Sequence, residues 1–319
     1  MAQSSEEYWR QREEEQRKKN ITDEKEYQRE INRIYADMMD SIQKEIDTFY
    51  ARYAQKEGIT LAEAKKRVSQ MDIDEYSRKA KRYVEDKDFS DQANEEMRLY
   101  NLTMKINRLE MLKANIGMEL VGGFDELQKY FDRTLTDKTL EEFERQAGIL
   151  GKTVQNNAKL AEAIVNASFH NATFSDRIWM HQDLLKSELA KQLQIGLIQG
   201  KSSRELARNI RKVFDVSRSD AERLMTTELR RVQTGAAKQS YERNGNTEYT
   251  FLTTNPKGAC DVCKALDGKH FKVVNMQPGK NAPPMHPCCH CTTAPYWDEE
   301  KFQKWLEEEN RKMHKRMKL

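Results

Sequence analysis

The chain has 319 residues, of which 37% are hydrophobic and 34% are charged. No stretch approaches the roughly 20 consecutive apolar residues of a membrane-spanning helix, so we expect no membrane association. The start of the chain, MAQSSEEYWRQREEEQ, lacks the apolar core of a secretory signal. We therefore expect a protein made in a cytoplasm. An apolar share this low favours long, solvated helices over one large core.

The charge is distributed unevenly along the chain. Residues 1–150 hold 27 basic and 33 acidic side chains, a net charge of −6, whereas residues 151–319 hold 28 and 19, a net charge of +9. A basic second half favours a polyanionic partner such as nucleic acid or an acidic protein face. The alternative is an ordinary solvated surface with a loose basic tail.

The first half predicts an arm followed by a long-helix region. Residues 1–30 are so polar that we expect a disordered arm, or one that folds only on a partner. Residues 31–150 show apolar side chains at spacings of three and four, which is typical of helices with one buried stripe. The two stripes consist of Ile31, Ile34, Tyr35, Met38, Ile42, Ile46, Phe49 and Tyr53, and of Leu99, Leu102, Ile106, Leu109, Leu112 and Ile116.

Helix boundaries are predicted from capping pairs and glycines. All six prolines and all five cysteines lie after residue 255, so we expect helices up to about Gly245, with residues 151–245 as the second helical part. A hydroxyl followed three residues later by Glu predicts a helix start, as in Thr60/Glu63, Thr139/Glu142, Ser202/Glu205 and Ser219/Glu222. Glycines predict helix ends, namely Gly58, Gly122–Gly123, Gly148, Gly151 and Gly200.

After Gly245 the pattern changes to a small module, residues 246–297. The β-branched and aromatic residues of Glu248–Thr254 and His270–Val274 predict short strands, with a turn at Asp267–Gly268. Residues 298–319 predict a terminal helix, from Asp298 to Arg311, and a basic tail. The expected fold is therefore mainly α: an elongated helical body with a small α+β module that a zinc ion staples at the C-terminal end.

The strongest chemical signal is a cluster of five cysteines and two histidines within this module. Cys260 and Cys263 form a CxxC pair, and the segment His286-Pro287-Cys288-Cys289-His290-Cys291 follows. Two short-spaced pairs from separate loops are typical of a tetrahedral structural Zn²⁺ site, which can stabilise a module too small to fold on its core alone. Cys260 and Cys263 form the first pair. The second pair is Cys288 with Cys291, His286 with Cys289, or Cys289 with Cys291.

Enzymatic signatures are missing around this cluster. There is no HExxH motif and no HxE before a CxxC, which excludes the protease and deaminase patterns. Glu228 lies among arginines and is more typical of an ion pair on a helix face. The rival hypothesis is a zinc-dependent nuclease or toxin-like effector that uses Glu228 with His286 or His290. We expect no enzyme and assign no catalytic residues.

A series of motifs in the second half of the chain resembles the phage minor head protein family, also called head morphogenesis or Mu F-like proteins, in both the motifs and their order. They lie between about residues 170 and 297. The motifs are Phe174–Trp179, Gly200–Ala207, Thr226-Thr227-Glu228, Asn244-Gly245, Cys260-x-x-Cys263, Leu266–Lys269 and Pro284–Cys291. The family ending resembles HPxCRC, in which Cys288 fills the variable position and His290 replaces the arginine.

The resemblance implies a non-enzymatic component of the virion. The metal ligands it implies are drawn from Cys260, Cys263, His286, Cys289 and Cys291, because the last three match the family histidine and cysteines. Such proteins are made in the host cytoplasm, enter the procapsid with the portal, scaffold and major capsid proteins, and stay inside the capsid near the portal. From the resemblance we expect portal association, and from the basic second half we expect non-specific DNA contact.

Overall fold

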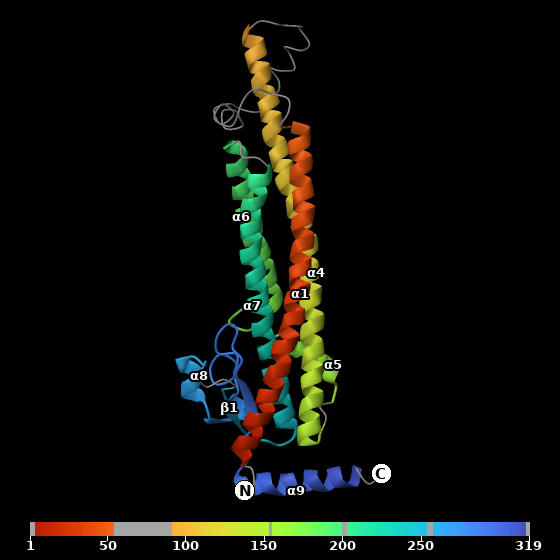
Figure 1. The fold of residues 1–319 in the computed structure, drawn as a ribbon, viewed down its shortest axis with the longest axis vertical. Helices are drawn as coiled ribbons and strands as arrows, with labels where there is room; N and C mark the ends of the chain where they lie inside the picture. Colours follow the sequence, from red (N-terminus) through yellow and green to blue (C-terminus); the bar gives the residue numbers. More distant parts are fainter. Residues whose placement is uncertain (1–3, 54–90, 153–154, 200–202, 254–257, 317–319) are drawn as a thin grey trace. The chain divides into compact units, whose positions relative to one another are not determined.

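A computed structural model describes residues 4–53, 91–152, 155–199, 203–253 and 258–316. The helices of the body are α1 (Ser5–Tyr53), α4 (Asp91–Leu150), α5 (Asn157–Val165), α6 (Phe174–Ile198) and α7 (Ser203–Arg243) (Figure 1). The C-terminal part contains β1 (Glu248–Leu252), α8 (Asp261–Leu266), β2 (His270–Lys272), the 3₁₀ turn η1 (Val273–Asn275), β3 (Thr292–Pro295) and α9 (Glu299–Arg316). The expected mainly helical fold with a small α+β module is confirmed. None of the described helices is long and apolar enough to cross a membrane.

The chain divides into two compact units, each assembled from separate stretches of sequence. The first unit comprises Met1–Glu30, Gln128–Arg177 and Ala221–Leu319, and the second comprises Ile31–Leu127 and Ile178–Asp220. Helices α1, α4, α6 and α7 contribute residues to both units. The unit boundary after Glu30 coincides with the first division that composition predicts, whereas the divisions at residues 150, 245 and 297 fall inside the first unit.

The core of the second unit follows the predicted helical stripes. The buried side chains include Ile31, Ile34, Tyr35, Met38, Ile42 and Ile46 of α1 and Leu109, Leu112 and Ile116 of α4. The remaining members of the two stripes have side chains outside the described set. Burying one face of each helix supplies the hydrophobic free energy that these charged helices need.

Several predicted helix boundaries are wrong. Gly122–Gly123 and Thr139 lie inside α4, and Ser219 lies inside α7. Gly123 is needed for packing, because a Cβ there would collide with the Cγ of Met38. Thr139 does not cap a helix, since its hydroxyl donates to the carbonyl of Leu135 one turn earlier.

Two other predicted boundaries have different outcomes, and four positions are not described. Gly148 also lies within α4, whereas Gly151, with a φ of 89°, follows the end of that helix as predicted. The predicted boundaries at Gly58, Thr60 and Gly200–Ser202 lie outside the described residues.

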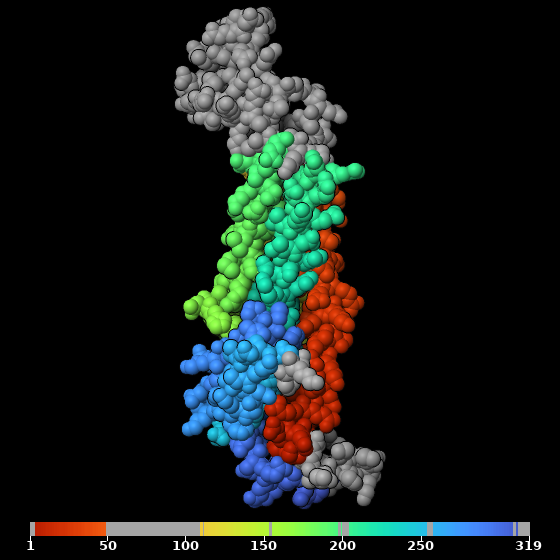
Figure 2. Space-filling model, turned by 60° about the vertical axis from the view of Figure 1, so that its left-hand side comes forward, coloured from red at the N-terminus to blue at the C-terminus, as the bar shows by residue number. Residues whose placement is uncertain are grey.

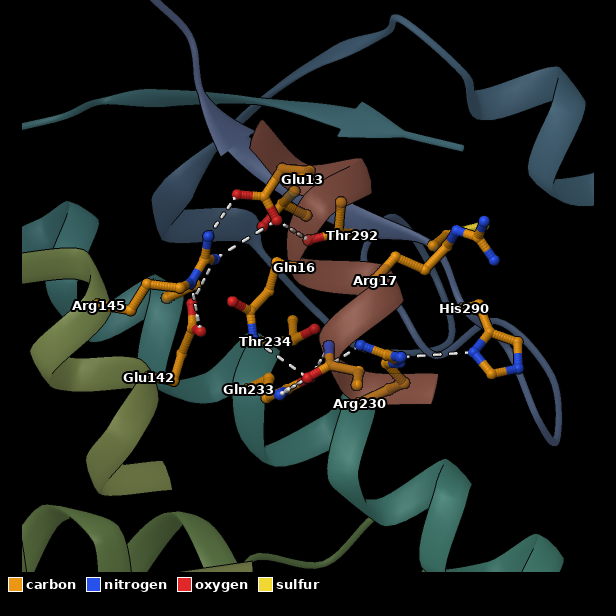
Figure 3. A pocket seen from close by; sticks show the side chains of 14 residues that line it. Glu13, Gln16, Arg17, Glu142, Arg145, Arg230, Gln233, Thr234, His290 and Thr292 are labelled. Atoms are coloured by element: carbon orange, nitrogen blue, oxygen red, sulfur yellow. Dashed lines mark hydrogen bonds and ion pairs between the residues drawn. The ribbon is translucent and has the colours of Figure 1, made fainter. Parts of the chain in front are cut away.

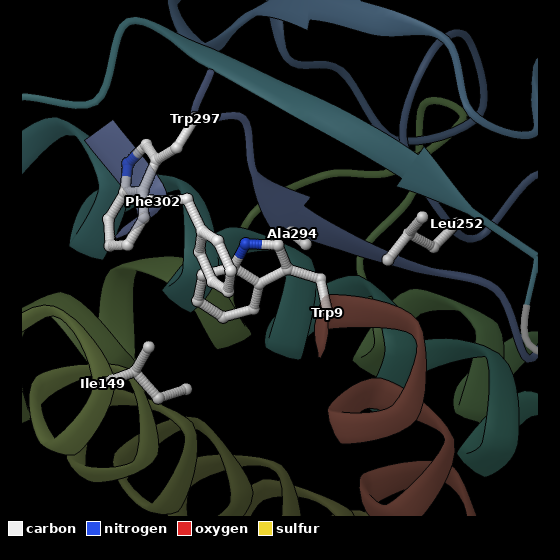
Figure 4. Packing of buried hydrophobic residues seen from close by; sticks show 6 residues of the cluster. All are labelled: Trp9, Ile149, Leu252, Ala294, Trp297 and Phe302. Atoms are coloured by element: carbon white, nitrogen blue, oxygen red, sulfur yellow. The ribbon is translucent and has the colours of Figure 1, made fainter. Parts of the chain in front are cut away.

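The first residues are not a disordered arm in the structure. Ser5–Glu30 is the beginning of α1, and Trp9 is buried in a cluster with Trp297 and Phe302 (Figure 4). The Trp9 and Trp297 rings lie edge to face, with centroids 5.5 Å apart. The expectation failed because the apolar partners of this polar segment come from the other end of the sequence.

The sheet has the strand order β2–β1–β3, and both pairings are antiparallel. Both predicted strands are present, as β1 and β2. The predicted turn between them is present too: Gly268 has a φ of 72°, which glycine adopts readily, and its N–H donates to the carbonyl of Phe251. Strand β3 was not predicted. It pairs Thr292–Pro295 with Tyr249–Leu252 and follows directly after the cysteine-rich segment.

Candidate metal centre

The CxxC pair is positioned by the start of helix α8. Cys260 is the N-cap residue, and its Sγ accepts a hydrogen bond from the backbone N–H of Cys263 at 3.5 Å. The cap turns the chain so that Cys263 lies in the first turn of the helix. Both sulfurs are thereby brought to one side of the loop, which explains why two intervening residues suit a shared metal ion.

The second group of donors comes from the loop before β3. The backbone N–H of Cys289 donates to the carbonyl of His286 at 3.2 Å, a turn that places these two residues near each other. The Cys263 Sγ lies 3.6 Å from the His286 Nε2 and 3.9 Å from the Cys289 Sγ. Segments that are far apart in sequence therefore meet at Cys263.

Five donors form two overlapping groups that share Cys263. The first contains Cys260, Cys263 and His286, the second Cys263, Cys289 and Cys291, and the ligand atoms of each group lie within 4.8 Å of one another. Zinc bond lengths place tetrahedral ligands about 3.8 Å apart for two sulfurs and about 3.6 Å apart for sulfur and nitrogen. The distances around Cys263 fit these values. Neither group includes a carboxylate, so the donor set suits a soft or borderline cation such as Zn²⁺.

The surroundings of the thiols are apolar. Cys263 and Cys289 are each 1% exposed and Cys291 is 7% exposed, and all three pack with Phe251. Burial raises the pKa of Cys263 to about 12. A hydrogen bond from the Cys291 thiol lowers the pKa of Cys289 to about 5, and the same bond raises the pKa of Cys291. Several thiolates can coexist in such a site only when a cation compensates their charge.

Two candidate residues of this segment point elsewhere. Cys288 is exposed and belongs to neither donor group. Its backbone N–H donates to the hydroxyl of Thr227 on α7, which anchors the loop. His290 lies with its Nδ1 3.4 Å from the Nη2 of Arg230. Burial and the Arg230 charge lower the pKa of His290 to about 4, so its ring is neutral at pH 7. Within the described residues, the pairing of Cys288 with Cys291 has no geometric support.

A buried polar network on the first unit holds the chain that follows Cys291 (Figure 3). Arg145 of α4 binds Glu13 of α1 at 2.7 Å and Glu142 at 2.8 Å. Glu13 also accepts a hydrogen bond from the hydroxyl of Thr292, the first residue of β3, at 2.9 Å. The network encloses a cavity of about 20 Å³, space for roughly one or two water molecules. Sequence analysis missed it, because no local pattern links these residues.

A second contact attaches the first turns of α1 to helix α8. Arg10 donates two hydrogen bonds to the carboxylate of Asp267, at 3.1 and 3.2 Å. Asp267 follows the last residue of α8 and also accepts from the backbone N–H of Thr253. Figure 2 shows the blue C-terminal module lying against the red start of the chain. Charged side chains of the predicted arm thus hold the cysteine-rich module in place.

Glu228 has a structural position. It is 1% exposed and binds Arg231 at 2.5 Å and Arg177 at 3.2 Å. Arg231 also donates to the carbonyls of Ile164 and Val165 at the end of α5. The carboxylate is occupied by two guanidinium groups, and neither His286 nor His290 is among its contacts in the described part of the chain. The arrangement matches the predicted ion pair, although it is buried and not on a helix surface.

Comparison with known proteins gives two matches. Residues 187–294 match the family described as Phage Mu protein F like protein, which confirms the resemblance over that range. The chain is also 30% identical over 114 residues to NAD(+)--arginine ADP-ribosyltransferase EFV of Enterococcus faecalis. This match covers 34% of the chain and 23% of that enzyme, so the chain spans well under two thirds of the relative's length. No solved structure matches the chain significantly.

Proposed function

Because residues 187–294 carry a phage Mu protein F-like region, we propose that this chain is a minor head protein that takes part in phage head morphogenesis. The family match is the observation that carries the proposal, and it supports a phage head-related protein of the virion. The ordered set of motifs from Phe174 to Cys291 supports the same assignment. In this proposal the chain has a structural role and no catalytic residues.

The metal centre has a structural role in this proposal. Cys260, Cys263 and His286 hold a Zn²⁺ ion together with Cys289 or Cys291. Bound there, the ion crosslinks the start of α8 to the loop before β3. Because the two three-donor groups share Cys263, each has a fourth candidate ligand from the other group close by, which supports a closed coordination sphere. Thr227 and Arg230 of α7 position the loop through Cys288 and His290.

The proposed partners are those of an internal head component. The chain binds the portal protein, contacts scaffold and major capsid proteins during assembly in the host cytoplasm, and remains inside the capsid. Co-expression of the tagged chain with portal subunits tests this, and the expected result is co-purification of the two. Failure to co-purify, together with absence of the chain from the mass spectrum of purified virions, would contradict the proposal.

Non-specific contact with packaged DNA is the second part of the proposal. The net charge of +9 on residues 151–319 supports it. Phosphate contacts release counterions, so the affinity for a DNA duplex of random sequence should fall steeply as salt is raised. Fluorescence anisotropy at several salt concentrations measures this. No binding at low salt, or an affinity independent of salt, would remove DNA from the list of partners.

The alternative of a zinc-dependent nuclease or toxin-like effector makes a different prediction. It requires an open metal position and a free acidic group, whereas Glu228 is bound by Arg177 and Arg231. Incubation of the zinc-loaded chain with plasmid DNA, and separately with NAD⁺, tests for nuclease activity and for the activity named for the enterococcal relative. Product formation that Glu228→Gln abolishes while the protein stays folded would favour the enzyme.

A further inference from the structure

Helix α7 begins, in the second unit, with a row of exposed cations. Arg204, Arg208 and Lys212 recur every four residues, so they follow one another along one face of the helix. All three side chains are exposed, and none of them forms an ion pair in the described part of the chain. Residues 203–212 carry four basic side chains and one acidic side chain, Glu205, a net charge of +3. The row therefore presents positive charge that no ion pair neutralises.

The fourth cation of this segment, Arg211, has a different environment. It lines a cavity between α1 and α7 together with Asp40 and Asp215, so acidic groups share its surroundings. Asp215 is itself bound by Arg218 at 3.4 Å. We therefore count only the other three cations as the row.

Helix α6 of the same unit shows how an ordinary solvated face differs. Its exposed charges alternate in sign, with Asp183 followed by Lys186 and Lys191. Lys191 also binds Glu188 at 3.3 Å, so part of the positive charge is neutralised within the helix. Mixed charge of this kind is typical of a helix face that contacts only water. The unmixed row on α7 instead favours a polyanionic partner.

Charge density favours DNA over an acidic protein as that partner. A helix rises about 1.5 Å per residue, so the eight steps from Arg204 to Lys212 span about 12 Å. Duplex DNA carries roughly one negative charge per 1.7 Å of its axis, or about seven charges over this length. A row of carboxylates on a helix offers only about one charge per turn of 5.4 Å. The duplex therefore supplies several phosphates for each cation of the row.

The composition of the row favours the phosphate backbone over the bases. Residues 203–213 contain no aromatic side chain on which the bases of a single strand could stack. Two of the three cations are arginines, whose guanidinium groups bind phosphate oxygens in a bidentate manner. We propose that Arg204, Arg208 and Lys212 form the surface through which this chain binds the phosphate backbone of duplex DNA. The inference rests on the proposed contact with packaged DNA and names the place where that contact is made.

The salt dependence of DNA binding tests this surface. Fluorescence anisotropy measures the affinity of the full chain for a short duplex of random sequence at several salt concentrations. Each phosphate contact contributes about 0.9 to the slope of log K against log salt. The combined variant Arg204→Gln, Arg208→Gln and Lys212→Gln should therefore lower the slope by about 2.7 and weaken binding at low salt at least about tenfold. Arg208→Gln alone should lower the slope by about 0.9.

A matched variant in the first unit separates this surface from net charge. Lys269→Gln, Lys272→Gln and Lys280→Gln together remove the same charge from three exposed lysines. This variant should lower the slope by less than about 1. Circular dichroism should show the same helix content and the same Tm for the wild type and for both combined variants, because all six positions are exposed.

Several outcomes would overturn the inference. An unchanged slope in the α7 variants would place the DNA contact on another surface, and an equal loss in the matched variant would assign it to net charge alone. Poly-L-glutamate that displaces the duplex at equal charge concentration would reassign the row to an acidic protein. No DNA binding by the wild-type chain would remove both the row and DNA. The proposed role in head assembly would then still stand or fall with co-purification of the portal.

Discussion

The two units of the chain are stabilised by different means. The second unit is held by apolar stripes on helices, such as the stripe of α1 that buries Ile34 and Ile42. The first unit combines three separate stretches of sequence and relies on a thiol-rich centre, buried ion pairs and an aromatic cluster. Helical packing repeats along the sequence, whereas metal ligands and ion pairs are made between distant residues. The two units should therefore respond differently to the same perturbation.

Metal removal should produce the largest difference. A structural zinc contributes about 10–16 kcal/mol in small zinc-binding peptides, so a chelator should unfold the sheet of the first unit. Hydrogen exchange at the amides of Phe251 and Thr293 should accelerate by at least about a hundredfold, while exchange at Ile42 and Leu112 should change little. Equal acceleration in both units would show that the metal does not act locally.

Trp9→Ala should give the next largest effect. It removes the central ring of the cluster with Trp297 and Phe302 and should lower the free energy of unfolding by about 3–5 kcal/mol. Met118→Ala, at a side chain that is 73% exposed in the second unit, should change it by less than about 0.5 kcal/mol. Denaturant titrations measure both. A small effect at Trp9 would mean that the start of α1 contributes little to the first unit.

Glu228→Gln should be destabilising by about 1.5–3 kcal/mol, because it removes the charge that Arg231 and Arg177 share. Glu162→Gln, on the exposed side of α5, is the matched control and should be close to neutral. Thermal unfolding followed by circular dichroism compares the two. Unchanged stability of Glu228→Gln would indicate that the buried ion pairs of the first unit are dispensable.

Arg10→Gln should have the smallest effect, about 1 kcal/mol, because the bidentate pair with Asp267 is only partly buried. Arg29→Gln breaks an exposed pair with Glu26 and should cost less. Differences of this size are measurable in urea titrations. If Arg29→Gln were the more destabilising variant, the proposed contact between α1 and the C-terminal module would lose its energetic support.

The same contrast explains which features could be predicted from the sequence. The helical stripes, the first two strands and the CxxC pair depend on neighbours within a few residues, so their spacing predicts them. Contacts such as Glu13 with Arg145 or Cys263 with Cys289 depend on the fold and have no local signature. For the same reason the sequence predicted disorder around Trp9, which lies in α1. It also predicted a helix start at Thr139, which lies within α4.

The motif around Thr227 and Glu228 shows what the sequence can and cannot predict. The sequence identified these residues as part of a family resemblance, but it could not assign their roles. In the structure, Thr227 holds the loop that carries Cys289, and Glu228 pairs with two arginines. Both residues therefore have structural roles in the first unit.

The central claim is that a metal ion holds the C-terminal module together at Cys263. Elemental analysis of the purified full chain tests it most directly, combined with the variants Cys263→Ser and Cys288→Ser. We predict one zinc ion per chain, loss of zinc and of sheet structure in Cys263→Ser, and retention of both in Cys288→Ser. A metal-free chain with a folded module, or zinc retained in Cys263→Ser, would contradict the account.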